Sequence, residues 1–90
     1  MTLDEIVQAL KEGRMFKAAC AGDNFWRSWQ LTPNGDVMGC RGWGKVGHGA
    51  DFESPELAAL GIASCMKSAR FKVAYGADNG MQIVRFESVQ

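Results

Sequence analysis

The chain has 90 residues, enough for one domain with a modest hydrophobic core, and its ten basic residues balance ten acidic ones. No global field therefore draws it to nucleic acid or to a membrane, and a charged ligand must meet a local patch. Three scattered cysteines (Cys20, Cys40 and Cys65) and one histidine lack zinc-site spacing and do not form a disulfide framework, so we expect buried free thiols, no metal and no cofactor. The N-terminal "MTLDEIVQAL" is unlike a signal peptide, and no apolar run is long enough to span a membrane, so we expect a cytoplasmic protein with no membrane partner.

The first expected element is a short helix over residues 2–12. Thr2 and Glu5 have capping-box spacing, and Gly13 is a suitable residue to end the helix. Apolar residues recur between them at helical spacing, and they predict one buried stripe: Leu3, Ile6, Val7 and Leu10.

Three strands are expected next, over residues 15–20, 25–32 and 37–43, with turns at "AGDN" and "PNGD". Alternation places Trp29 on the core-facing side of the second strand together with Arg27, and Trp26 on the opposite, exposed side. Gly39 and Gly42 indicate a bulge or a close backbone approach in the third strand.

The second half of the chain predicts a fourth short strand at "ADFE", a longer helix and a last strand over residues 81–89. Ser54 is suited to cap the helix and Pro55 to open it. Its packed face is expected to carry a partly apolar stripe: Leu57, Leu60, Gly61, Ser64, Ser68 and Phe71. The order of elements predicts a single α+β domain over residues 1–90, with a twisted antiparallel sheet of four to five strands and both helices on one face.

The most unusual stretch is "RGWGKVGHG", residues 41–49, which contains the pattern G-x-G-x-x-G. A dinucleotide site is excluded by context, because the helix begins only at Ser54 and no acidic residue follows about twenty positions later. One interpretation is a tight turn in which Gly44, Gly47 and Gly49 adopt positive φ. The other is a binding loop, since Trp43 and cations lie among glycines that expose backbone amides.

Residues 24–76 resemble the WGR domain family, which is named for a Trp-Gly-Arg triplet. The segments that carry the resemblance are "NFWRSWQL", "RGWGKVGHGADF" and "SPELAALGIASCMKSARFKVAYG". Lys45 stands at the arginine position of the triplet, where it keeps the charge but lacks the bidentate guanidinium. Tyr75-Gly76 stands where the family commonly has Gly-Tyr.

WGR domains of known role bind nucleic acid, notably DNA ends, and contact neighbouring domains. The resemblance implies that Trp43 packs against a terminal sugar or base and that Lys45 faces phosphate or a partner, assisted by the amides of Gly44 and Gly47. The residues themselves suggest that Arg41, Lys45 and His48 cluster in a compact loop, and that Lys67, Arg70 and Lys72 form a second basic patch or a merely solvated helix end. The expected function is non-catalytic binding of DNA or RNA.

A protein-interaction adaptor or inhibitor that uses Trp26 and the glycine-rich loop is the alternative, favoured by the zero net charge. Catalysis is disfavoured because the chain has no Ser-His-Asp constellation, and Asp51 and Glu53 near His48 are typical of an exposed edge strand. The last strand could close the sheet or pair with a second copy, so the sequence leaves the oligomeric state open.

Overall fold

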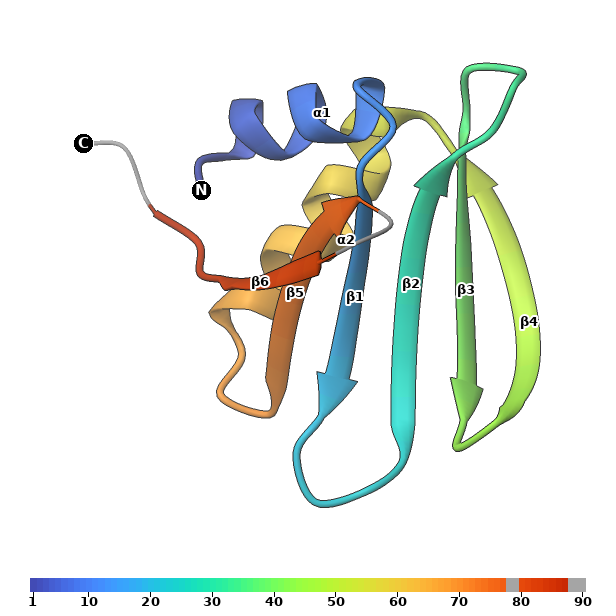
Figure 1. The fold of residues 1–90 in the computed structure, drawn as a ribbon, viewed down its shortest axis with the longest axis vertical. Coiled ribbons are helices and arrows are strands. Elements are labelled where there is room, and N and C mark those ends of the chain that lie inside the picture. The colour runs from blue at the N-terminus through green and yellow to red at the C-terminus, as the bar shows by residue number, and fades with distance from the viewer. Residues whose placement is uncertain (78–79, 88–90) are drawn as a thin grey trace.

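The computed structural model describes residues 1–77 and 80–87, which form two helices and a six-stranded antiparallel sheet (Figure 1). The elements in chain order are α1 (Leu3–Lys11), β1 (Met15–Cys20), β2 (Phe25–Leu31), β3 (Val37–Trp43), β4 (Val46–Glu53), α2 (Pro55–Lys67), β5 (Phe71–Ala77) and β6 (Gly80–Val84). The predicted α+β class is confirmed.

The sheet is open, with strand order β4-β3-β2-β1-β5-β6 (Figure 1). It has six strands where we predicted four to five, because residues 71–77 form β5 and pair with β1. The fourth strand is also longer than "ADFE" and begins at Val46. The last strand is shorter than predicted, since β6 ends at Val84, and residues 88–89 of the prediction lie outside the described part.

The start of α1 confirms the predicted capping box. The Thr2 hydroxyl accepts a hydrogen bond from the Glu5 amide, and the Glu5 carboxylate accepts one from the Thr2 amide at 2.9 Å. The hydrogen bond donated by the Thr2 amide, together with the Thr2 side chain, favours the ionised carboxylate and holds the pKa of Glu5 below its usual value. Gly13 follows the helix with a φ of +87°, which allows the chain to turn into β1.

Helix α2 begins as predicted, since Ser54 caps it and Pro55 occupies its first turn, but the predicted packed face is wrong. Leu57 and Leu60 are 56% and 54% exposed, and Phe71 lies on β5 rather than on the helix. The buried face consists mainly of small residues: Pro55, Ala58, Ala59, Ile62, Ala63, Cys65 and Met66. An alanine-rich face lets the helix approach the sheet and α1 closely, and this packing outweighs the burial of the two leucines.

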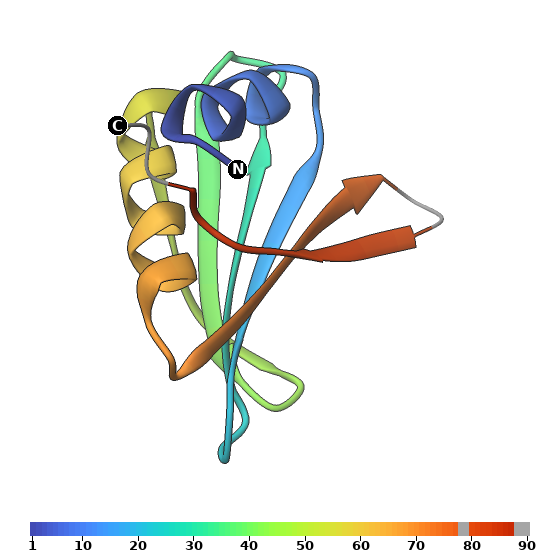
Figure 2. The ribbon, with the colours of Figure 1, turned by 90° about the vertical axis from the view of Figure 1, so that its left-hand side faces the viewer.

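Both helices lie on one side of the sheet, as predicted (Figure 2). The hydrophobic core consists of buried side chains from both helices and from the sheet. Its largest fully buried side chains are Trp29, Phe16, Ile6, Leu10, Ile62, Val37 and Val73. Cys20 and Cys65 are buried free thiols as expected, whereas Cys40 is only half-buried. We call the side of the sheet opposite to the helices the open face.

Candidate nucleic-acid interface at the β3–β4 turn

Strands β3 and β4 are joined by a two-residue turn, Gly44-Lys45, at the centre of the glycine-rich stretch. Gly44 adopts a φ of +57°, but Gly47 and Gly49 do not have positive φ, so two of the three predicted positions are wrong. They lie in β4, where the extended backbone needs no left-handed residue. Two bonds from the β2 side hold the turn: the Gly44 amide donates to the Asn24 carbonyl, and the Trp26 indole N–H donates to the Gly44 carbonyl, both at 2.8 Å.

The predicted close backbone approach in β3 is present at Gly42, whereas the bulge lies in the partner strand β4. The pairing of β3 with β4 shifts between Arg41 and Gly42, which leaves His48 as the extra residue of a bulge. A Cβ on Gly42 would lie 2.2 Å from the Val46 carbonyl oxygen and 2.5 Å from the Trp26 ring. Glycine is therefore required here by close approach.

Trp43 lies beside the turn and remains 50% exposed. Its ring packs on Phe25 with centroids 5.0 Å apart, and Phe25 in turn contacts Phe71 at 6.3 Å. A hollow of about 260 Å³ is lined by these three aromatic residues together with Asp23 and Arg70. The structure thus brings together Trp43 and Arg70, two of the predicted site residues.

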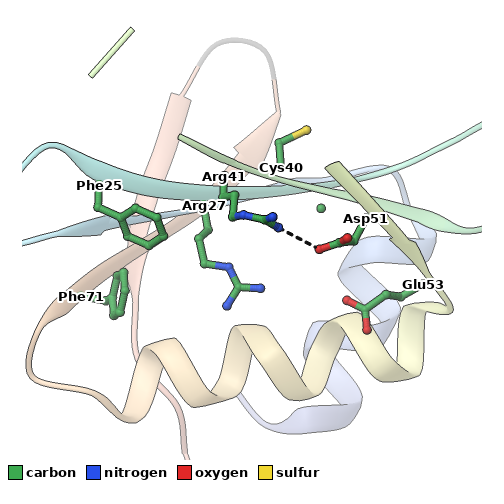
Figure 3. A pocket seen from close by; sticks show the side chains of 8 residues that line it. Phe25, Arg27, Cys40, Arg41, Asp51, Glu53 and Phe71 are labelled. Atoms are coloured by element: carbon green, nitrogen blue, oxygen red, sulfur yellow. Dashed lines mark hydrogen bonds and ion pairs between the residues drawn. The ribbon is translucent and has the colours of Figure 1, made fainter. Parts of the chain in front are cut away.

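A second hollow of about 340 Å³ continues from Phe25 and Phe71 toward α2 (Figure 3). The Arg27 side chain extends into it, and the Arg41 guanidinium bonds the Asp51 carboxylate at 3.2 Å. We call the two hollows together the arginine groove. Glu53 lies at its far end, while the Cys40 thiol points to the other side of the sheet (Figure 3).

The other predicted basic residues do not gather at Trp43. Lys45 is exposed at the turn, His48 is in the bulge, and Arg41 is turned toward Asp51. Of the three, only Arg41 lines either hollow, so the loop cations do not form one compact cluster there.

The predicted patch at the helix end is also divided. The Lys67 ammonium lies 4.6 Å from the Phe86 ring at the end of α2, and Arg70 faces the arginine groove. Lys72 lies in register with Ala19 on the open face, whereas Arg70 precedes β5 and lines the hollow with Phe71 on the helix side. The patch therefore does not form as a unit.

The sequence analysis did not name Arg27, Phe25 and Phe71 as site residues. A signal for Arg27 existed, because alternation placed this cation on the core-facing side of its strand. Its guanidinium lies 4.9 Å from the Trp29 ring, and its charge opposes the effect of burial, which raises the pKa of the nearby Cys65 thiol. Phe71 could not be found, since it was assigned to the helix.

Within residues 1–77 and 80–87, no three His, Cys, Asp or Glu side chains gather closely enough to hold a metal ion. No helix in the same part of the chain is long and apolar enough to cross a membrane. No protein-family model matches the chain, and no curated protein or solved structure matches it either. The resemblance to WGR domains stays a prediction.

Proposed function

We propose that this protein is a non-catalytic nucleic-acid-binding module that contacts a DNA end through Trp43 and the arginine groove. The observation that carries the proposal is that Trp43 keeps half of its surface exposed while its ring is braced by Phe25 and lies beside Arg70. A supported, exposed indole next to a guanidinium offers both a stacking surface and a phosphate contact.

The charges of the groove are distributed in a way that supports this function. Asp51 is engaged with Arg41, but no carboxylate of the described residues lies within ion-pair distance of Arg27 or Arg70. Arg70 donates one hydrogen bond, to the Cys20 sulfur at 3.9 Å, and Arg27 lies on the Trp29 ring, so both guanidinium groups keep N–H donors that can meet phosphate oxygens together with the exposed Lys45. Since Lys45 offers a point charge instead of a fork, the bidentate phosphate contact falls to the two arginines.

The test is a fluorescence-anisotropy titration of a labelled blunt DNA duplex at low and moderate salt. It compares an open-ended duplex with one closed by hairpins at both ends, and wild type with Trp43→Ala and Arg70→Gln. We expect salt-sensitive binding that prefers open ends and weakens in both variants. Absence of duplex binding at low salt, where phosphate contacts are strongest, would refute the proposal.

A protein-interaction module is the second candidate, and the exposed leucines of α2 favour it. Leu57 and Leu60 lie one turn apart on the surface, where they offer an apolar anchor to a partner. Pull-down with wild type and with Leu57→Ser/Leu60→Ser tests this candidate. A partner retained by both proteins would show that these leucines are not the anchor.

A further inference from the structure

The open face of the sheet has a charge of one sign among the described residues. The register of the six strands assigns alternate residues to this face, and no aspartate or glutamate occupies those positions in β1 to β6. Asp51 and Glu53, the acidic residues of β4, point to the helix side. Lys17 and Lys72 lie on the open face, so this surface is complementary to an anion.

Trp26 forms a flat aromatic surface on this face. Its ring lies directly over the backbone of Gly42, because a Cβ there would be 2.5 Å from Cζ2 and 2.8 Å from Cε2. The bond from its indole N–H to the Gly44 carbonyl fixes the ring in that position. The residue is half-buried, so part of the ring is held against Gly42 and part stays accessible to a ligand beside the Lys17 ammonium.

The two lysines flank this ring. The Lys17 ammonium lies 6.0 Å from the Trp26 ring centroid, on the diagonally adjacent position of β1. Lys72, Ala19 and Trp26 lie in one row of the strand register, across the neighbouring strands β5, β1 and β2 (Figure 1). Two strand spacings separate Lys72 from Trp26, about 10 Å, and the small Ala19 leaves the space between them open.

We infer that the open face binds single-stranded nucleic acid, with one base stacked on Trp26 and the adjoining phosphates at Lys17 and Lys72. A single strand fits because its bases are free to stack on a side chain, whereas a duplex would offer this face phosphates alone. The ring is already fixed by Gly42 and Gly44, so little side-chain freedom is lost on binding. This surface is separate from the arginine groove, which lies on the other side of the sheet.

The test is an anisotropy titration of a labelled oligothymidylate across a salt series. A length of roughly 12 nucleotides is within the range that small single-strand-binding domains cover. Lys17→Gln/Lys72→Gln removes the two open-face charges. Lys11→Gln/Lys67→Gln removes the same net charge from the helix side and is the matched control. Trp26→Leu removes the stacking ring, and the lysine variants keep the test valid should that variant unfold.

We expect Lys17→Gln/Lys72→Gln to lower oligothymidylate affinity by at least about tenfold and to reduce the salt slope by about 1.4, since each single-strand phosphate contact contributes about 0.7. The control variant should change neither the affinity nor the salt slope beyond the general effect of net charge. The open-ended duplex should bind Lys17→Gln/Lys72→Gln as it binds wild type.

Equal loss of oligothymidylate affinity in both double variants, or no oligothymidylate binding at low salt, would overturn the inference. Displacement by polyglutamate as efficiently as by unlabelled oligothymidylate would also overturn it, because a surface that reads charge alone needs no stacking ring. The duplex proposal is judged separately, by Trp43→Ala.

Discussion

Replacing Gly42 by alanine should damage the fold and the Trp26 surface together. The new methyl group would lie 2.2 Å from the Val46 carbonyl oxygen and 2.5 Å from the Trp26 ring, so both the β4 backbone and the indole must move. Overpacking of this kind costs about 1–3 kcal/mol. Displacing the indole also strains its bond to the Gly44 carbonyl, worth about 1 kcal/mol. Alanine has less conformational entropy than glycine in the unfolded chain, and this difference stabilises the folded state by about 0.4–1 kcal/mol. Together these contributions give an expected loss of about 1–3.6 kcal/mol, with a midpoint near 2.3 kcal/mol.

Gly47, the cross-strand partner of Gly42, provides the matched control. A Cβ on Gly47 meets no atom within 4 Å, and its φ is not in the left-handed region. Gly47→Ala should therefore leave stability unchanged or raise it by about 0.5–1 kcal/mol.

Thermal unfolding followed by circular dichroism distinguishes the two variants. A domain of this size loses about 4–8 °C in Tm per kcal/mol, so Gly42→Ala should melt roughly 10–20 °C below wild type. Its near-ultraviolet spectrum should also change as the Trp26 indole is displaced. If the two alanine variants melted within about 4 °C of each other, the close approach at Gly42 would be refuted.

Three further predictions concern single side chains. Trp43→Ala should cost about 2 kcal/mol in urea unfolding, because half of the residue is exposed, against about 3–5 kcal/mol for Trp29→Ala, which is 1% exposed; equal costs would mark Trp43 as a core residue. Lys45→Arg creates the Trp-Gly-Arg triplet of the family that the sequence resembles, and it should retain or increase duplex affinity in the anisotropy assay; abolished binding would contradict the role proposed for Lys45. Hydrogen bonds from Thr2 lower the pKa of Glu5 in the folded state, so its stabilisation is complete above the usual value of 4.5 and is lost as pH falls through the lower folded value. The difference in unfolding free energy between wild type and Glu5→Gln should therefore be constant above pH 4.5 and shrink below it.

The elements with strong local signals were predicted correctly from the sequence. The capping box of Thr2 and Glu5 and the "PNGD" turn each act over a few residues, and the structure has both. Alternation along β2 was also correct, since Trp29 is buried and Trp26 is on the open face. Caps, turns and strand alternation depend on the backbone conformation and hydrogen bonds of residues close together in the sequence, so the sequence alone predicts them.

The wrong predictions concern features that depend on packing between segments far apart in the sequence. Helix α2 has apolar residues on both sides, so periodicity alone does not identify the packed face, and the larger Leu57 and Leu60 were chosen over the alanines. No glycine or proline separates α2 from β5, so helical spacing in the sequence extends to Phe71. The arginine groove depends on this strand, because Phe71 and Arg70 reach Trp43 only once β5 is beside β1.

The zero net charge, taken alone, argued against a nucleic-acid partner, but the distribution of charge changes that argument. The shortest dimension of the domain is 25 Å, about three screening lengths at physiological salt, so the exposed acidic side chains of the helices scarcely weaken the field at the open face, and Asp51 on β4 is paired with Arg41. Near 0.01 M salt the screening length is about 30 Å, and the acidic groups across the domain then oppose binding. The logarithm of oligothymidylate affinity should therefore stop rising linearly as salt falls toward about 0.01 M. If the slope of log affinity against log salt stayed constant over this range, the acidic groups on the helix side would not oppose binding at the open face. The proposed role of the charge distribution would then be wrong.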